Sequence, residues 1–67
     1  MEKFCERLKE LRLERNISAV QLSKVLNVSD TTILRWEKGL IIPGIDHLKN
    51  IAIFFNVSTD YLLGLED

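Results

Sequence analysis

Residues 18–39 decide the fold of this chain, because they contain two helical patterns with very little sequence between them. They read SAVQLSKVLNVSDTTILRWEKG. Leu22 and Leu26 are spaced to share one face of a first helix. Ile33 and Trp36 are spaced in the same way for a second helix. The joint between the two is so short that the second helix must cross the first at a steep angle.

The joint Asn27-Val28-Ser29 is one of three similar tripeptides, with Asn16-Ile17-Ser18 and Asn56-Val57-Ser58. All three match the Asn-x-Ser glycosylation pattern, but the charged N-terminal segment has no signal-peptide core, which argues against that interpretation. Asparagine tolerates the left-handed conformation that ends a helix, and serine caps the start of the next one. We therefore predict a helix–helix joint at each tripeptide, and a capping box between Ser18 and Gln21.

Helical periodicity also dominates the rest of the chain. The stretch over about residues 2–15 places Phe4, Leu8 and Leu11 on one helix face. The joints and the glycine positions predict the remaining helices at about 18–26, 29–38, 45–55 and 58–63. No alternation typical of β-strands competes with this pattern. The prediction is an all-α fold of five helices in a single domain, residues 1–67.

The composition is that of a small globular domain. The chain has 67 residues, 46% of them apolar and 28% charged, and no apolar run approaches the roughly 20 residues of a membrane-spanning helix. Cys5 is the one cysteine, so no intramolecular disulfide can form. We expect a cytoplasmic protein with no membrane partner.

The geometry predicted for residues 18–38 is that of a helix-turn-helix, whose second helix can enter the DNA major groove. Further motifs accompany it: Leu8-Lys9-Glu10-Leu11-Arg12, Ile33-Leu34-Arg35-Trp36-Glu37-Lys38-Gly39 with Pro43 after it, Leu48 to Ala52, and Asn56 to Gly64. Together they resemble the Xre-type helix-turn-helix family, which includes the Cro proteins and repressors of lambdoid phages. The resemblance implies a lambda-repressor-like five-helix bundle. It also implies sequence-specific DNA binding in transcriptional control, usually by a repressor that binds a two-fold operator as a homodimer.

The resemblance implies four base-reading residues at the start of the third helix: Asp30, Thr31, Leu34 and Arg35. Arg35 can fork onto the O6 and N7 atoms of guanine. Thr31 can donate, accept or pack its methyl group against thymine, and Leu34 can make apolar contact alone. Asp30 can accept a hydrogen bond from cytosine N4 or can stabilise the helix N-terminus, and both interpretations stay open.

Phosphate contacts are implied for four further residues: Ser18, Ser29, Thr32 and Lys38. The chain departs from the family pattern at Ala19, where glutamine is usual, and at Leu40-Ile41-Ile42, where basic or polar residues are common. Both changes remove phosphate contacts. The formal charge is −1, with +2 in residues 1–43 and −3 in residues 44–67. We expect weak electrostatic attraction to DNA, with about 3–4 phosphate contacts per protomer.

Two structural roles complete these expectations. Arg12 and Glu37 occupy positions that the family pairs as a buried salt bridge, which would orient the third helix. The apolar residues also exceed what one small bundle can bury. We predict self-association through the fourth and fifth helices in a two-fold contact, with four interface residues: Ile53, Phe54, Leu63 and Leu65.

An alternative function is a protein-interaction module on the same fold, in which Leu40-Ile41-Ile42 contacts a protein instead of phosphates. No nucleophile–base set or glycine-rich phosphate loop is visible, so we do not expect an enzyme. His47 has no cysteine or second histidine to share a metal ion with. The sequence accordingly predicts no metal, no cofactor and no small-molecule ligand.

Overall fold

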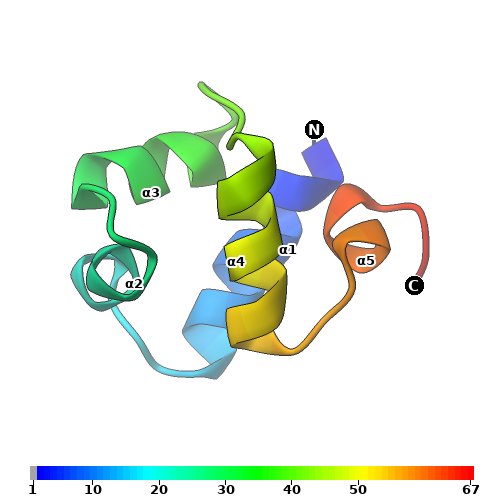
Figure 1. Cartoon of the computed structure of the whole chain (residues 1–67), viewed down its shortest axis with the longest axis horizontal. Coiled ribbons are helices and arrows are strands. Elements are labelled where there is room, and N and C mark those ends of the chain that lie inside the picture. The colour runs from blue at the N-terminus through cyan, green and yellow to red at the C-terminus, as the bar shows by residue number, and fades with distance from the viewer. Residues whose placement is uncertain (1) are drawn as a thin grey trace.

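Five helices make up the secondary structure of residues 2–67, the part of the chain that the computed structural model describes. They are α1 (Glu2–Glu14), α2 (Ala19–Leu26), α3 (Asp30–Lys38), α4 (Ile45–Phe55) and α5 (Thr59–Leu63). Figure 1 shows α2 and α3 at one end of the molecule, α4 in front of α1 at the centre, and α5 at the other end. The predicted all-α fold of five helices is confirmed, and each predicted boundary lies within one residue of the observed one. None of these helices combines the length and apolar character needed to cross a membrane.

The helix–helix joints have the geometry that their sequence predicts. Asn16, Asn27 and Asn56 adopt the left-handed backbone conformation, with φ of 55°, 58° and 56°. The serine that follows two residues after each asparagine has extended backbone, and its side chain accepts a hydrogen bond from the first turn of the next helix. For this reason α2, α3 and α5 begin one residue later than predicted. Ser18 and Gln21 form the complete capping box.

One hydrophobic core joins all five helices. Its buried side chains are Phe4, Leu8, Leu22, Leu26, Ile33, Trp36, Ile51, Ala52, Phe55 and Leu62. Helices of 5 to 13 residues are marginal in water by themselves, so packing against this core stabilises them. Ser23 is buried between the apolar residues of α2, and its hydroxyl donates to the carbonyl of Val20 at 2.6 Å. The small serine side chain therefore adds no unpaired polar group to the core.

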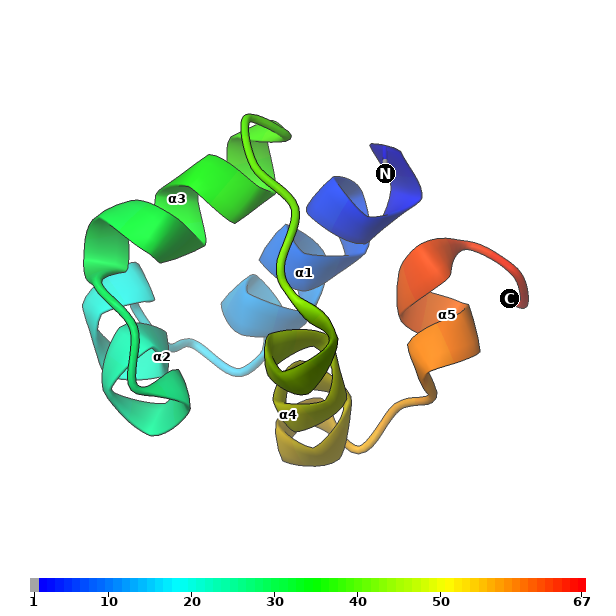
Figure 2. The ribbon, with the colours of Figure 1, turned by 45° about the horizontal axis from the view of Figure 1, so that its top comes forward.

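The connection from α3 to α4 exposes an unusual amount of apolar surface. Figure 2 shows this segment running from the C-terminal end of α3 to the start of α4. Gly39 ends α3 with a φ of 75°, and Pro43 is buried. Between them the apolar side chains of Leu40-Ile41-Ile42 are 41–68% exposed, and Ile45 at the start of α4 is 85% exposed.

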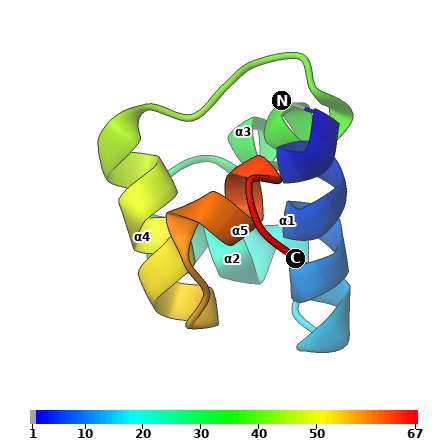
Figure 3. The ribbon, with the colours of Figure 1, turned by 90° about the vertical axis from the view of Figure 1, so that its right-hand side faces the viewer.

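Two arginines, one in α1 and one directly after it, hold the C-terminal half of the chain. Arg7 donates hydrogen bonds to the carbonyls of Tyr61 and Glu66, the second at 2.6 Å, and its guanidinium lies 4.2 Å from the centre of the Tyr61 ring. The C-terminal segment accordingly folds back towards α1 (Figure 3). Arg15 donates to the carbonyl of Phe54 at 3.0 Å, at the end of α4. These contacts supplement the few backbone bonds that the five-residue α5 can make itself.

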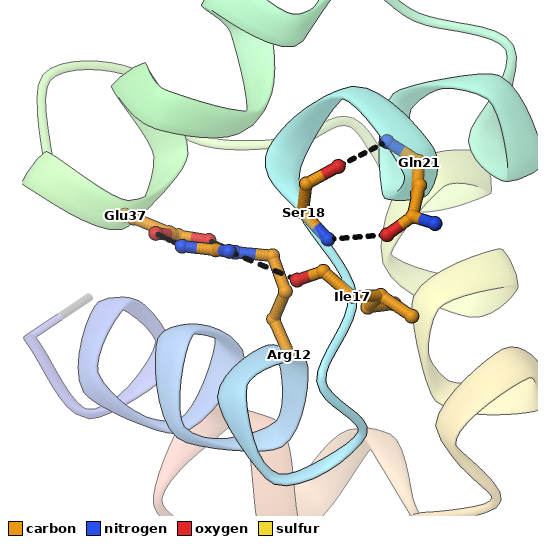
Figure 4. A network of polar contacts seen from close by, with 5 residues as sticks. All are labelled: Arg12, Ile17, Ser18, Gln21 and Glu37. Carbon is orange, nitrogen blue, oxygen red and sulfur yellow. Dashed lines mark hydrogen bonds and ion pairs between the residues drawn. The ribbon is translucent and has the colours of Figure 1, made fainter.

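Arg12 connects α1, the first joint and α3 (Figure 4). Its Nε and Nη2 donate to the two carboxylate oxygens of Glu37 at 2.7 and 3.0 Å, and its Nη1 donates to the carbonyl of Ile17 at 3.1 Å. The Arg12 and Glu37 side chains are 12% and 5% exposed, so the ion pair is largely shielded from water. The hydrogen bond that Arg12 donates to Glu37 raises the pKa of Arg12, which keeps the guanidinium charged.

Replacing Arg12 with alanine should lower the free energy of unfolding by about 3–5 kcal/mol, because the change strands the Glu37 carboxylate in a largely buried position. Urea denaturation at constant pH measures the loss. The matched control is Lys9→Ala, which removes a positive charge from an exposed position on the same helix. The control should stay within about 0.5 kcal/mol of the parent. An unfolding curve for Arg12→Ala that coincides with the control would contradict the structural role of the ion pair.

Gly64 offers a second test of the fold. Its φ is 81°, and a methyl group added there would lie 2.7 Å from Cβ and Cγ of Lys3. We expect Gly64→Ala to destabilise the domain by about 1–3 kcal/mol through backbone strain and this close contact. Gly44 has a φ of −67° and open space around its Cα, so Gly44→Ala should change stability by less than about 0.5 kcal/mol. Equal effects of the two changes in thermal unfolding would contradict the backbone strain and the close contact predicted at Gly64.

Candidate nucleic-acid interface

The third helix has one buried face and one exposed face. Ile33 and Trp36 point into the core and are 0% and 2% exposed. The exposed residues are the four expected base-reading residues and Lys38, namely Asp30, Thr31, Leu34, Arg35 and Lys38. The helical spacing therefore places these side chains together on the side of α3 that faces away from the core. The Arg12–Glu37 pair fixes the rotation of the helix that presents them.

Arg35 has a different environment from the other arginines. Within residues 2–67, the guanidinium groups of Arg7, Arg12 and Arg15 all donate hydrogen bonds to other parts of the chain. Arg35 has no such hydrogen bond or ion pair in that part of the chain, and it is exposed at the middle of α3. Its planar set of donors is therefore available to a ligand that offers paired acceptors.

The hydroxyl groups expected to contact phosphates already form hydrogen bonds at the N-termini of α2 and α3. Ser18 Oγ accepts from the backbone N–H of Gln21 at 3.0 Å. Ser29 Oγ accepts from the backbone N–H of Thr32 at 3.1 Å and shares a hydrogen bond with Thr32 Oγ1 at 2.8 Å. Since Ser29 and Thr32 share one hydroxyl hydrogen, the pair retains one for an outside acceptor. The hydroxyl of Ser18 keeps its hydrogen, because in the cap it accepts only.

The two departures from the family pattern have different structural consequences. Ala19 packs partly buried against the core, so it presents no polar group to the outside. Leu40-Ile41-Ile42 stays exposed and forms an apolar edge next to the end of α3. The sequence analysis missed Ile45 as part of this edge. Its spacing to Leu48 suggests the buried stripe of α4, but the first turn of α4 extends beyond the core, which leaves Ile45 exposed.

The residues expected at a dimer interface divide into two pairs. Ile53 and Leu65 are 66% and 73% exposed. Phe54 and Leu63 are only partly exposed, because the monomer already covers them. The ring of Phe54 packs edge-on against Phe55 with centroids 4.9 Å apart. The spacing of residues along α4 and α5 did not predict this partial burial of Phe54 and Leu63. Residue spacing does not show how closely the two helices approach α1.

His47 lies against the core side of the α3–α4 connection. Its ring centre lies 5.5 Å from that of Trp36 with a tilt of 52°, and its Nδ1 is buried without a hydrogen-bond partner in the described structure. No group of three or more His, Cys, Asp or Glu side chains within residues 2–67 is placed to hold a metal ion. The histidine is therefore part of the packing between α3 and α4.

Comparison with known proteins gives consistent matches. The family model described as Helix-turn-helix matches residues 8–62. The chain is 42% identical to the HTH-type transcriptional activator BcrR of Enterococcus faecalis over 64 residues, which are 96% of this chain and 31% of that protein. It is 32% identical to the HTH-type transcriptional regulator ImmR of Bacillus subtilis (strain 168) over 62 residues, which are 92% of this chain and 49% of that protein. The chain thus spans between about a third and a half of these relatives.

A solved structure agrees with the sequence matches. The fold superposes on the P22 c2 repressor protein, crystallised in complex with synthetic operator 9T, with a TM-score of 0.84 and 29% sequence identity. The superposition covers 88% of this chain and 89% of the repressor chain. The motifs, the observed packing of α2 against α3 and these matches lead to one conclusion. The chain belongs to the Xre-type helix-turn-helix family, the family of the Cro proteins and phage repressors.

Proposed function

We propose that this domain binds double-stranded DNA in a sequence-specific manner and regulates transcription. The main observation behind the proposal is the exposed face of α3. The guanidinium of Arg35 is unpaired in the described structure and lies on this face with Thr31, Leu34 and Lys38. A helix of this kind fits the major groove, where arginine can donate two hydrogen bonds to guanine. The likeness to a repressor solved on its operator supports this orientation.

In the proposed complex, two sets of residues have different tasks. Asp30, Thr31, Leu34 and Arg35 face the base edges and determine which sequence is bound. The set proposed for phosphates, which does not distinguish sequences, is Ser18, Ser29, Thr32 and Lys38. Only Lys38 in this second set carries a charge, so non-specific attraction is weak. Base contacts then supply a large part of the binding free energy.

We further propose that the protein acts as a homodimer on a two-fold operator. Ile53 and Leu65 offer exposed apolar surface at the α4–α5 end, and a partner copy would cover it. Two recognition helices would then enter successive major grooves roughly 34 Å apart. Occupancy of a promoter by such a dimer represses transcription by occlusion. We propose repression because it needs only occupancy of the promoter by the domain itself. One relative is named an activator, and activation would need further contacts with polymerase. With DNA as the proposed ligand, we also propose that the protein acts in the cytoplasm.

A protein-interaction module is the second candidate, and the exposed segment Leu40-Ile41-Ile42 favours it. Exposed apolar segments of this kind often mark protein interfaces. In that case Arg35 would have no role in binding duplex DNA. The two functions are separated by the experiment that follows.

DNA binding is tested by fluorescence anisotropy with a labelled pool of random duplexes at several salt concentrations. We expect binding that weakens with salt, with a shallow log–log slope between about −1 and −3 per protomer, because only Lys38 among the 3–4 expected phosphate contacts is charged. On a duplex selected from the pool, Arg35→Ala should cost about 1–3 kcal/mol of binding free energy. Lys9→Ala makes the same charge change on α1 and should cost far less. Absence of salt-dependent binding to every duplex would favour the protein-interaction module.

Self-association is tested by light scattering over a range of concentrations up to high micromolar. We expect a dimer mass for the parent and a shift towards monomer for Ile53→Gln, because glutamine removes exposed apolar surface from the proposed interface. Ile45→Gln is the matched control, since Ile45 is also exposed on α4 but lies at the opposite end of that helix. A parent protein that stays monomeric, or equal effects of the two changes, would contradict this interface.

A further inference from the structure

We propose that Leu34 recognises the C5 methyl group of a thymine that neighbours the guanine bound by Arg35. The inference rests on the proposed function and makes it more specific, because it names the chemical group that the centre of α3 reads. It assigns to Leu34 a role in specificity that differs from that of the polar residues around it.

Leu34 is an apolar side chain fixed in an outward position. It is 40% exposed, although Ile33 before it is completely buried. The buried Ile33 before Leu34, and Trp36 with the Arg12–Glu37 pair after it, hold α3 in place. The helix therefore cannot rotate to bury this leucine without opening the core and breaking the ion pair.

The surroundings of Leu34 are polar and charged. Thr31 lies one turn before it on the exposed face, Lys38 lies one turn after it, and Arg35 is its neighbour. The leucine is thus a single apolar group on a polar face, which is too small for a protein-binding patch. A ligand that fits this face must offer one small apolar group among hydrogen-bonding groups.

The major groove of DNA meets that description. Every base edge there presents donors and acceptors, and the thymine methyl is the one apolar group among them. Arg35 and Leu34 are consecutive and both exposed on α3, so in a groove they would reach base edges that lie close together. With Arg35 on guanine, Leu34 is then close to the adjacent base pair, and a thymine methyl there covers its exposed apolar surface.

The experiment replaces single thymines by uracil in a duplex selected with the parent protein. Uracil keeps the hydrogen-bonding groups of thymine and lacks only the methyl group. We expect at least one thymine beside a guanine at which uracil weakens binding by about fourfold, the value for loss of one buried methyl-sized group. This uracil penalty should disappear in Leu34→Ala, which keeps the helix propensity and the charge of α3.

Two controls make the result specific. Lys38→Ala should weaken binding to thymine and uracil duplexes equally, so it should keep the fourfold ratio. Leu40→Ala shortens another exposed leucine and should also keep it. Thermal unfolding of Leu34→Ala should match that of the parent, since the side chain lies outside the core.

The outcomes separate the two proposals. Salt-dependent DNA binding with no uracil penalty at any thymine, or with a penalty that persists unchanged in Leu34→Ala, overturns the role of Leu34 and leaves the proposed function standing. A selected site without thymine next to guanine overturns it as well. Absence of binding to any duplex overturns the proposed function together with this inference.

Discussion

The ion pair between Arg12 and Glu37 is the interaction on which the arrangement of this domain depends. Both partners lie near the ends of their helices, and Arg12 also binds the carbonyl of Ile17 in the first joint. One side chain thereby sets the position of α3 relative to α1 and to the entry into α2. The pair is largely shielded from water, so its two hydrogen bonds to the carboxylate must compensate for lost hydration. A rigid α3 is the result, and the face that it presents has a defined orientation.

The use of arginine within the fold bears on how a nearly neutral domain could bind DNA as proposed. Arg7 and Arg12 of α1 bind other parts of the chain, and so does Arg15, the residue after that helix. Their charges hold the bundle together and are not free for a ligand. Arg35 and Lys38, by contrast, place positive charge on the exposed face of α3. The proposed interface has few free charges and would rely on matching base edges, which agrees with an apolar leucine at its centre.

Local rules were sufficient for much of the fold and for part of the candidate site. Asparagine and serine at each joint act on their immediate neighbours, so the helix ends could be predicted to within one residue. The exposed face of α3 follows from helical spacing once Ile33 and Trp36 are assigned to the core. The exposure of Ile45 could not be predicted in this way, because Ile45 fits the spacing of the buried stripe of α4 and yet is 85% exposed. Periodicity gives the direction of a side chain around a helix, but not whether the core extends to that turn.

The sequence by itself determined the number of helices, their joints, and the identity of the side chains that α3 presents, because these depend on residues within one or two turns of each other. The tertiary structure alone decided which polar groups remain available. It uses Arg7, Arg12 and Arg15 for internal contacts and leaves Arg35 unpaired in the described structure. It also half-buries Phe54 and Leu63 while it leaves Ile53 and Leu65 exposed. The physical reason is that burial and hydrogen-bond pairing depend on contacts between segments far apart in the chain, which helical spacing does not contain.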